Sequence, residues 1–320
     1  MQTLQTCASR ATSFREACIL MAVWGCLPSS ATASLDLLVA GYNSDNVVRF
    51  DGTTGAFEGV FASGGGLDGP WDVTMGPDGN LYVASALSNA ILRYNGTSGQ
   101  FMGSFAAGGL NAPIAAVFGP DGNLYVSNTA GHNVTRYNGV TGALIDTFVP
   151  TGSGGLLTPR GMVFGPDGNL YVVSVTNDRV LRYNGATGAF LDVFASGGGL
   201  DFPGGLAFGA DGHLYVTSRD TNSVLRFDGS TGAFLGTFAS GGGLAGPTGL
   251  AFGPDGDLYV TSWRPFHTIM RFDGVTGAFD ELFTAQTASL VTPTFFTFIP
   301  EPSSVLLMGI VLLSGLRRRR

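Results

Sequence analysis

The stretch GPDGNLYV occupies residues 76–83 and returns unchanged at 119–126 and 165–172. Two variants follow, GADGHLYV at 209–216 and GPDGDLYV at 253–260, so the steps between the initial glycines are 43, 46, 44 and 44 residues. A shortened copy, LDLLVAG at 35–41, stands one period before the first full copy. A repeat of this length is typical of solenoids and propellers, in which each unit buries its apolar face against the next.

A second phrase follows each copy at a nearly fixed distance. It reads VRFDGTTGAF at 48–57, LRYNGTSGQF at 92–101, TRYNGVTGAL at 135–144, LRYNGATGAF at 181–190, LRFDGSTGAF at 225–234 and MRFDGVTGAF at 270–279. The two phrases together divide the chain into six units of similar length.

The hydrophobic pattern within one unit predicts four short strands. An alternating segment, GLAFG, leads into a Pro-Asp-Gly turn at 254–256, where glycine supplies the positive φ that tight turns need. LYVTS, a polar loop, a third apolar strand, a second glycine turn and a fourth strand follow. Four strands per unit, six times over, predict an all-β, six-bladed β-propeller rather than a sandwich or a β-helix.

The first strands predict how the ring closes. Units two to six have a first strand that begins at a proline, namely Pro70, Pro113, Pro159, Pro203 and Pro247. Unit one lacks this strand, but Pro293 followed by TFFTFI stands at the far end of the repeats. We expect residues 294–299 to pair with 35–41 and complete the first blade, because closure removes the open edges through which sheets aggregate.

The order P-x-G-L-x-F, D-G-N-L-Y-V, polar loop, V-L-R-F-D and G-x-F over residues 35–299 resembles NHL repeats and the related gluconolactonase-like propellers. NHL blades carry an aspartate after the Y-V-x stretch. Here those places hold serines, which we assign as Ser85, Ser127, Ser174, Ser218 and Ser262. The resemblance implies that a gluconolactonase-like enzyme would hold a metal with channel acids and amides, whereas streptogramin-lyase-like propellers use histidines.

The basic residues exclude several classes of function. The chain has no lysine, so it has neither a Walker-type phosphate loop nor a Schiff-base lysine. Outside residues 1–33 and 317–320 it has ten arginines and 22 acidic residues. This acidity argues against nucleic acid or an anionic membrane as the partner of the repeat domain.

Residues 1–33 have the pattern of a signal peptide. Arg10 and Arg15 precede the apolar run 17–27, and Ala31-Thr32-Ala33 forms a small-x-small cleavage site. A buried N-terminal strand or helix, and lipidation at the sequence VWGC of 23–26, are the alternatives. All three cysteines lie in this segment, so the processed chain would have no disulfide.

The C-terminal segment 300–320 resembles a PEP-CTERM sorting signal. It contains Pro300, Glu301 and Pro302, a twelve-residue apolar run at 305–316, and finally Arg317, Arg318, Arg319 and Arg320. The resemblance implies export, transient membrane association and processing by an exosortase in a Gram-negative bacterium that makes exopolysaccharide. The run is short of the roughly 20 residues that span a bilayer comfortably, although an ordinary C-terminal anchor is the alternative.

The repeats also act as an internal control for function. Residues that recur in every unit serve the fold; these include the arginines of the third strands, Arg49, Arg93, Arg136, Arg182, Arg226 and Arg271. We expect these to lie between blades, bonded to carbonyls or turn acids. The Asp-Gly turns lack the full spacing of a calcium loop, so turn chemistry explains them better. No metal site and no cofactor are predicted.

Departures from the repeat gather in loops that we assign to one face. The residues after the inter-blade prolines are expected to ring one mouth of the channel, and the loop 263–267 differs from its counterparts in length. The candidate ligand-binding residues are Trp71, Asp72, Arg160, Arg219, Asp220, Trp263, Arg264 and His267. Aromatic and arginine side chains so placed suit a sugar or a peptide, and plugging of the channel is the alternative.

No complete catalytic constellation is visible, since the three histidines are scattered among different units. The sequence therefore predicts a non-enzymatic binding or scaffolding module at the cell surface, the outer membrane or the exopolysaccharide matrix. Its predicted partners are an exosortase and an exopolysaccharide, glycan or surface protein. A metal-dependent propeller lactonase or lyase is the alternative.

Overall fold

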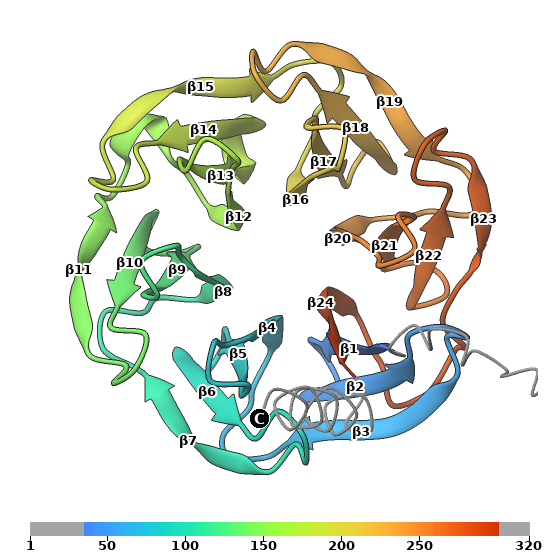
Figure 1. Ribbon diagram of the computed structural model, residues 1–320, viewed down its shortest axis with the longest axis horizontal. Coiled ribbons are helices and arrows are strands. Elements are labelled where there is room, and N and C mark those ends of the chain that lie inside the picture. The colour runs from blue at the N-terminus through green and yellow to red at the C-terminus, as the bar shows by residue number, and fades with distance from the viewer. Residues whose placement is uncertain (1–34, 301–320) are drawn as a thin grey trace, which may run out of the picture. The chain divides into compact units, whose positions relative to one another are not determined.

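The computed structural model describes residues 35–300, which form six four-stranded antiparallel sheets around a ring (Figure 1). The predicted signal peptide 1–33 and residues 301–320 of the predicted sorting signal lie outside the described residues. Within 35–300 the helical elements are the short 3-10 turns η1 (Ser153–Gly155) and η2 (Val175–Asn177). No helix in this range is long and apolar enough to cross a membrane. The predicted six-bladed propeller is confirmed.

The strands of each blade run from the channel outward. Blade one has β24 (Pro293–Pro300), β1 (Leu35–Gly41), β2 (Asn46–Asp51) and β3 (Phe57–Ser63); blade two has β4 (Pro70–Met75), β5 (Leu81–Ser85), β6 (Ala90–Tyr94) and β7 (Phe101–Ala106). Blade three has β8 (Pro113–Phe118), β9 (Leu124–Asn128), β10 (Asn133–Tyr137) and β11 (Leu144–Val149); blade four has β12 (Pro159–Phe164), β13 (Leu170–Ser174), β14 (Arg179–Tyr183) and β15 (Phe190–Ser196). Blade five has β16 (Pro203–Phe208), β17 (Leu214–Ser218), β18 (Ser223–Phe227) and β19 (Phe234–Ser240); blade six has β20 (Pro247–Phe252), β21 (Leu258–Ser262), β22 (Thr268–Phe272) and β23 (Phe279–Leu282).

The ring closes as the sequence predicts. The C-terminal strand β24 pairs antiparallel with β1, with Leu37 opposite Phe298 and Val39 opposite Phe296. The two ends of the repeat domain thus share one blade, and β24 is its innermost strand (Figure 1).

The recurring GPDGNLYV phrase builds the turn between the first and second strands. In blade two, Asp78 Oδ1 accepts the backbone N–H of Asn80 at 3.1 Å, and the Tyr82 hydroxyl donates to Asp78 Oδ2 at 3.0 Å. Burial raises the pKa of Asp78, but the hydrogen bonds from Asn80 and Tyr82 outweigh it and leave that pKa below its ordinary value. The aspartate therefore serves the turn in its ionised form, as predicted from turn chemistry.

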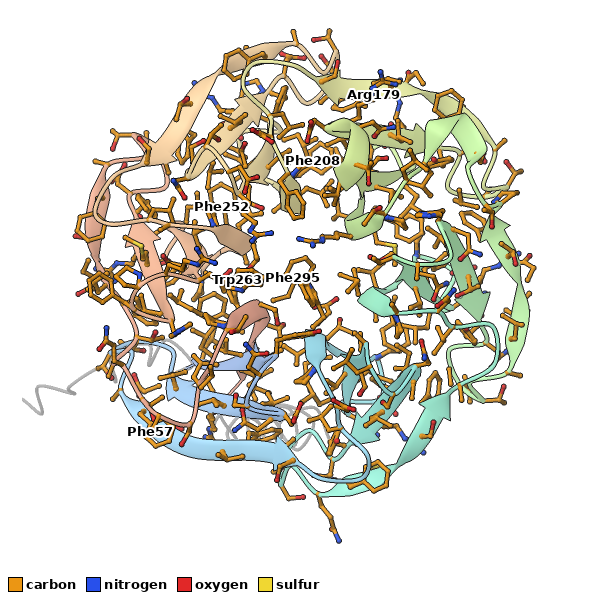
Figure 2. All side chains as sticks on the ribbon, turned by 180° about the vertical axis from the view of Figure 1, so that it is seen from behind. Phe57, Arg179, Phe208, Phe252, Trp263 and Phe295 are labelled. Carbon is orange, nitrogen blue, oxygen red and sulfur yellow. The ribbon has the colours of Figure 1, made fainter. Side chains whose placement is uncertain are left out.

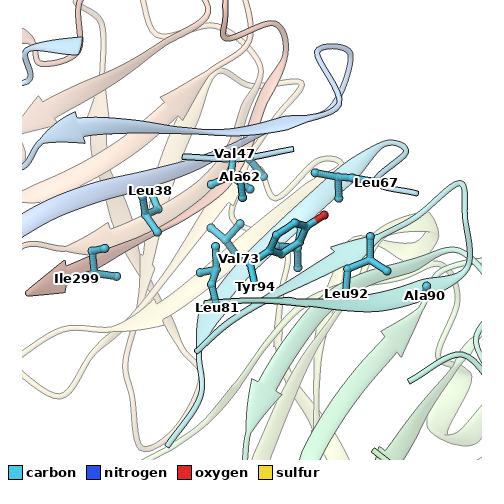
Figure 3. Packing of buried hydrophobic residues seen from close by; sticks show 12 residues of the cluster. Leu38, Val47, Ala62, Leu67, Val73, Leu81, Ala90, Leu92, Tyr94 and Ile299 are labelled. Atoms are coloured by element: carbon cyan, nitrogen blue, oxygen red, sulfur yellow. The ribbon is translucent and has the colours of Figure 1, made fainter. Parts of the chain in front are cut away.

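The same tyrosine joins neighbouring blades. The Tyr82 ring packs edge-on against Phe105 of its own blade at 4.8 Å and against Phe118 of the next blade at 5.1 Å between centroids. Tyr125, Tyr171, Tyr215 and Tyr259 make the same pair of contacts. Between blades one and two Leu38 replaces the tyrosine, and an aliphatic core forms with Val73 and Leu81 (Figure 3).

The third-strand arginines do not join blades as expected. Arg136 pairs with Asp146, and Arg182 with Asp192 and the turn acid Asp167. Arg93 and Arg226 lie over phenylalanines of their own outer strands. Among the described residues these partners belong to the arginine's own blade, so the arginines tie strands together within a blade. Bonding to turn acids is confirmed, but the expected position between blades is wrong.

In blades two to six the second strand ends on a polar side chain that holds the preceding inter-blade crossing by a hydrogen bond. Ser85 Oγ, for example, accepts the backbone N–H of Asp68 at 2.9 Å. In blade three this place belongs to Asn128, whose Oδ1 accepts the N–H of Asn111, and not to Ser127 as the sequence suggested. Ser127 lies one residue earlier and donates instead to the carbonyl of Arg160. The one-residue slip arose because the serine of blade three stands one place earlier than the serines of the other blades, so residue type and spacing disagree there.

Removal of β24 tests the closure. A chain truncated after Thr292 loses the buried side chains of Phe296 and Ile299 and exposes the edge of β1. We expect its melting temperature to fall on the order of ten degrees or more. A chain that ends at Pro302 is the matched control, because it lacks the tail but keeps β24. Equal melting of the two chains would contradict closure by this strand.

Candidate binding site at the channel mouth

The first strands of the six blades line the central channel, which holds a cavity of about 180 Å³. The residues at one register of these strands are Asp72, Ala115, Gly161, Gly205, Gly249 and Phe295. Three glycines stand there because the blades approach closely: a β-carbon at Gly205 would lie 2.8 Å from the carbonyl oxygen of Thr248. Phe295 is placed beside the channel in Figure 2.

Asp72 is the ionisable residue of this lining. Its side chain is 8% exposed, and its Oδ2 accepts the backbone N–H of Ala116 in the neighbouring blade at 2.9 Å. Burial raises the pKa of Asp72 to about 7, against the opposing effect of hydrogen bonds from Ala116 and Val73. The structure thus places this predicted ligand-binding residue in the channel wall, where it holds two blades together.

Four of the predicted residues come together with one that the sequence analysis missed. Trp71 and Trp263 meet edge-on at 6.3 Å between ring centroids. The Arg160 guanidinium lies 5.0 Å from the Trp71 ring and 4.6 Å from Phe202. Arg219 lies 4.6 Å from Phe202 and 4.5 Å from Trp263. These five side chains form a closed circuit of three aromatic groups and two arginines, here called the arginine–aromatic ring, in which each arginine lies between two aromatic groups and the two tryptophans meet directly.

The elements that carry the ring all open to one face. Trp71 and Arg160 follow the prolines that begin β4 and β12, and Phe202 precedes the proline that begins β16. Arg219 and Trp263 follow the ends of β17 and β21. Inter-blade crossings and second-to-third strand loops lie on the same face of a propeller, because consecutive strands alternate in direction. Figure 2 shows Trp263 next to the channel opening.

The two tryptophans differ in exposure. Trp71 is only 6% exposed and packs with Tyr42, Ala86 and Ile114, so it does not stand free on the face as expected. Trp263 is partly exposed. Trp71 is therefore the buried tryptophan of the arginine–aromatic ring, and Trp263 is the one that solvent can reach.

The ring carries positive charge in a desolvated place. Burial, together with the smaller effect of repulsion from the Arg219 charge, lowers the pKa of Arg160 to about 10. Arg160 remains charged at neutral pH nonetheless. The nearest carboxylate of Arg219 is Asp220, whose Oδ1 lies 4.0 Å from Arg219 Nε and whose side chain is 54% exposed. A solvated acid at this distance screens the pair of arginines only weakly.

Three donors of the ring have no hydrogen-bond partner among residues 35–300: Trp71 Nε1, Trp263 Nε1 and Arg160 Nη1. All three atoms are buried. Indole and guanidinium nitrogens donate and do not accept. Since buried donors are normally paired, the ring is a site with unused donors and no acceptor of its own.

Arg264 and His267 lie beside the ring rather than in it. Arg264 is exposed and lines a surface hollow with Arg219, Asp220 and Trp263. His267 takes part in another hydrogen bond that recurs in every blade. In this bond the side chain of a residue with positive φ accepts the backbone N–H of the residue just before the next inter-blade proline. The six acceptors are Asp45, Asn89, His132, Asp178, Asn222 and His267. The imidazole of His267 accepts from Thr292 at 3.2 Å through Nδ1.

This second bond, here called the blade staple, accounts for two of the three histidines. His132 Nδ1 accepts the N–H of Thr158 at 2.9 Å in the same manner. The third, His213, sits in a turn between first and second strands, on the opposite face, where Nδ1 accepts from Gly229. The structure thus brings no two histidines together.

Comparison with known proteins assigns the family. A family model for virginiamycin B lyase matches residues 62–281. The chain belongs to the virginiamycin B lyase family. The family differs from the NHL repeats named above, and the likeness to NHL repeats stays a prediction. A second model, the PEP-CTERM protein-sorting motif, matches residues 298–320 and marks this family member for export to the envelope or surface of a Gram-negative bacterium.

Solved structures share the fold at low identity. A chain in a nidogen/laminin complex is 17% identical with a TM-score of 0.68, covering 83% of this chain and 98% of that one. A protein of unknown function from Bacteroides caccae is 17% identical with a TM-score of 0.66, covering 84% and 100%. Virginiamycin B lyase from Staphylococcus aureus is 18% identical with a TM-score of 0.54, covering 82% and 78%. No curated protein matches this family member at a significant level.

Replacement of His267 tests the blade staple. His267→Ala removes the acceptor for the Thr292 N–H and should lower the free energy of unfolding by about 1 kcal/mol. His267→Asn is the matched control, because Asn222 occupies the same place in blade five with the same backbone geometry. We expect the asparagine variant to match the wild type in chemical denaturation. Equal losses in both variants would contradict the staple.

Asp72 gives the fold a pH dependence. Its pKa is about 7 in the folded chain against 3.8 in the unfolded one, so the fold favours the protonated carboxyl. That contribution is complete below about pH 4 and is lost as the pH rises to about 7, on the order of 4 kcal/mol. Asp72→Asn should therefore melt like the wild type at pH 4 and several degrees higher at pH 7. A difference that does not change with pH would contradict the assignment.

Proposed function

We propose that this chain is an exported, exosortase-processed propeller that binds a ligand at the arginine–aromatic ring, at the cell surface or in the exopolysaccharide matrix, without transforming it. The observation that carries the proposal is the set of buried donors without partners on Trp71, Trp263 and Arg160. Unpaired buried donors cost free energy in the free protein, and a bound acceptor recovers it.

The position of the ring supports binding over simple plugging. It stands at the one mouth of the channel where the six blades differ most, while residues away from that mouth repeat from blade to blade. Arg160 and Arg219 stack on aromatic rings and have no ion-pair partner in the channel wall. If they only filled the channel mouth, their burial would cost free energy of desolvation that aliphatic side chains would not.

The sorting motif supports the cell surface or the exopolysaccharide matrix as the place where the protein acts. The PEP-CTERM match begins at residue 298, inside β24, so the signal leaves the domain directly from its innermost strand. Residues 1–33 as signal peptide, 34–299 as propeller and 300–320 as sorting signal are the organisation that we propose. The exosortase is the implied processing partner, and an exopolysaccharide, glycan or surface protein is the proposed ligand.

A lyase is the second candidate, because the family model favours it. One solved relative is a catalytically inactive His-to-Ala variant of the Staphylococcus aureus enzyme with quinupristin. In this chain two histidines serve as staple acceptors and the third lies in a turn on the other face. Within residues 35–300 no group of three His, Cys, Asp or Glu side chains could hold a metal ion. These observations favour the binding module.

Retention on the matrix tests the proposed function. Trp263→Ala removes the accessible side of the ring and should weaken retention on isolated exopolysaccharide about tenfold or more, with little change in melting temperature. Arg179→Gln is the control, because Arg179 is exposed and far from the channel (Figure 2). Unchanged retention of the Trp263 variant would contradict the proposal. Turnover of a lactone or of quinupristin by the wild type would support the lyase instead.

A further inference from the structure

We propose that the arginine–aromatic ring recognises a carboxylate, and that its ligand is an acidic polysaccharide whose uronate residues are spaced along the chain. The inference rests on the proposed binding function and specifies the chemistry of the ligand. It follows from three observations: the donors of the ring, the way its guanidinium groups are held, and the distribution of charge over the two faces.

The ring offers donors alone. Trp71 Nε1, Trp263 Nε1 and Arg160 Nη1 are buried and have no partner within residues 35–300. None of these groups accepts a hydrogen bond, so a complementary ligand must bring acceptor oxygens. A hydroxyl group brings a donor along with each acceptor, whereas a carboxylate brings two oxygens that only accept. These unpaired donors therefore favour a carboxylate over an uncharged sugar as the ligand group.

The guanidinium groups are held by aromatic faces. Arg160 lies over Trp71 and Phe202, and Arg219 lies over Phe202 and Trp263, at 4.5 to 5.0 Å from the ring centroids. A stacked guanidinium keeps its N–H groups in one plane and directs them outward at its edge. This fork matches the two oxygens of a carboxylate. The faces of the aromatic rings are partly covered in the process, which leaves less surface for stacking of a neutral sugar.

The charge of the ring lacks an equal counter-charge. Arg160 and Arg219 repel one another, and the acid close to them is Asp220, which is 54% exposed and 4.0 Å from Arg219 Nε. An anion seated at the ring would be attracted by both arginines in a place of low polarity, where such attraction is strong. A cationic ligand would meet repulsion in the same place.

Acidic residues elsewhere on the surface limit how densely charged the ligand can be. The turns between first and second strands carry Asp78, Asp121, Asp167, Asp211 and Asp255, all on the face opposite the ring. On the ring's own face the loops carry Asp68, Asp178 and Asp201, and Asp178 Oδ1 accepts the backbone N–H of Phe202 at 2.8 Å. A polymer with a charge on every unit, such as a nucleic acid, would meet these acids. Spaced carboxylates can reach the ring and leave neutral sugars over the acidic loops.

Binding of a matched pair of polymers tests the inference. The probes are gellan, a polysaccharide with spaced glucuronate residues, and the same gellan with its carboxyl groups reduced to alcohols. Affinity is measured for the full-length chain in a non-ionic detergent. We expect gellan to bind, and reduction of its carboxyl groups to weaken binding about tenfold or more, as expected for loss of charge-assisted hydrogen bonds.

Variants locate the effect at the ring. Arg219→Gln and Arg160→Gln should each reduce the preference for gellan over reduced gellan about tenfold, while Arg179→Gln, with the same change in charge on the same face, should leave it unchanged. Melting temperatures identify any variant that fails to fold. Arg219 is the safer site because it is partly exposed, so its variant decides the matter if the Arg160 variant unfolds.

Each outcome is distinct. Equal binding of gellan and reduced gellan would overturn the carboxylate inference and leave the binding module standing. Binding of neither polymer would overturn the acidic polysaccharide as ligand, and retention on isolated exopolysaccharide then decides the binding function separately. Tighter binding to polyglutamate than to gellan would overturn the sugar part and point to an acidic peptide.

Discussion

The contact on which the propeller depends is the edge-on packing of a second-strand tyrosine against a phenylalanine of the next blade. Tyr82 and Phe118 show it at 5.1 Å, and four further blade interfaces repeat it within 0.1 Å. A four-stranded sheet alone has two open faces and cannot bury this tyrosine. The blades are therefore stable only as neighbours, and the ring must close so that none is left uncovered. The pairing of β24 with β1 meets that demand.

Because the contacts between blades stabilise the propeller, the loops can differ from blade to blade without unfolding it. On one face they stay uniform, with an aspartate in every turn between first and second strands that accepts from the tyrosine hydroxyl. On the other face the blade staples hold the loop ends, and residues beside them vary. Arg160, Phe202, Arg219 and Trp263 come from three successive blades, and Trp71 closes the circuit from a fourth. The arginine–aromatic ring can form only because the propeller is closed.

The sequence predicted the strands, the blades and the closure, because a sixfold repeat shows its own register. It also predicted four members of the arginine–aromatic ring, as departures from that register. It missed Phe202, because the departures were sought at the residue after each inter-blade proline and Phe202 stands before one. The same comparison at the residue before each inter-blade proline finds Phe202 as the departure among Gly69, Ala112, Thr158, Gly246 and Thr292. Asp72 and His267 were grouped with the ring because sequence shows position and not the direction of a side chain; one lies in the channel wall and the other in a staple.

The central claim is that the unpaired donors of the ring are the ligand's contacts. The chain has three tryptophans, of which Trp71 and Trp263 lie in the ring and Trp24 lies in the predicted signal peptide. The most direct measurement is an NMR titration of ¹⁵N-labelled processed protein with gellan oligosaccharides, following the indole N–H signals. The account predicts that both indole signals shift downfield together and saturate with the bound fraction. Saturating binding with neither indole signal moved would contradict it.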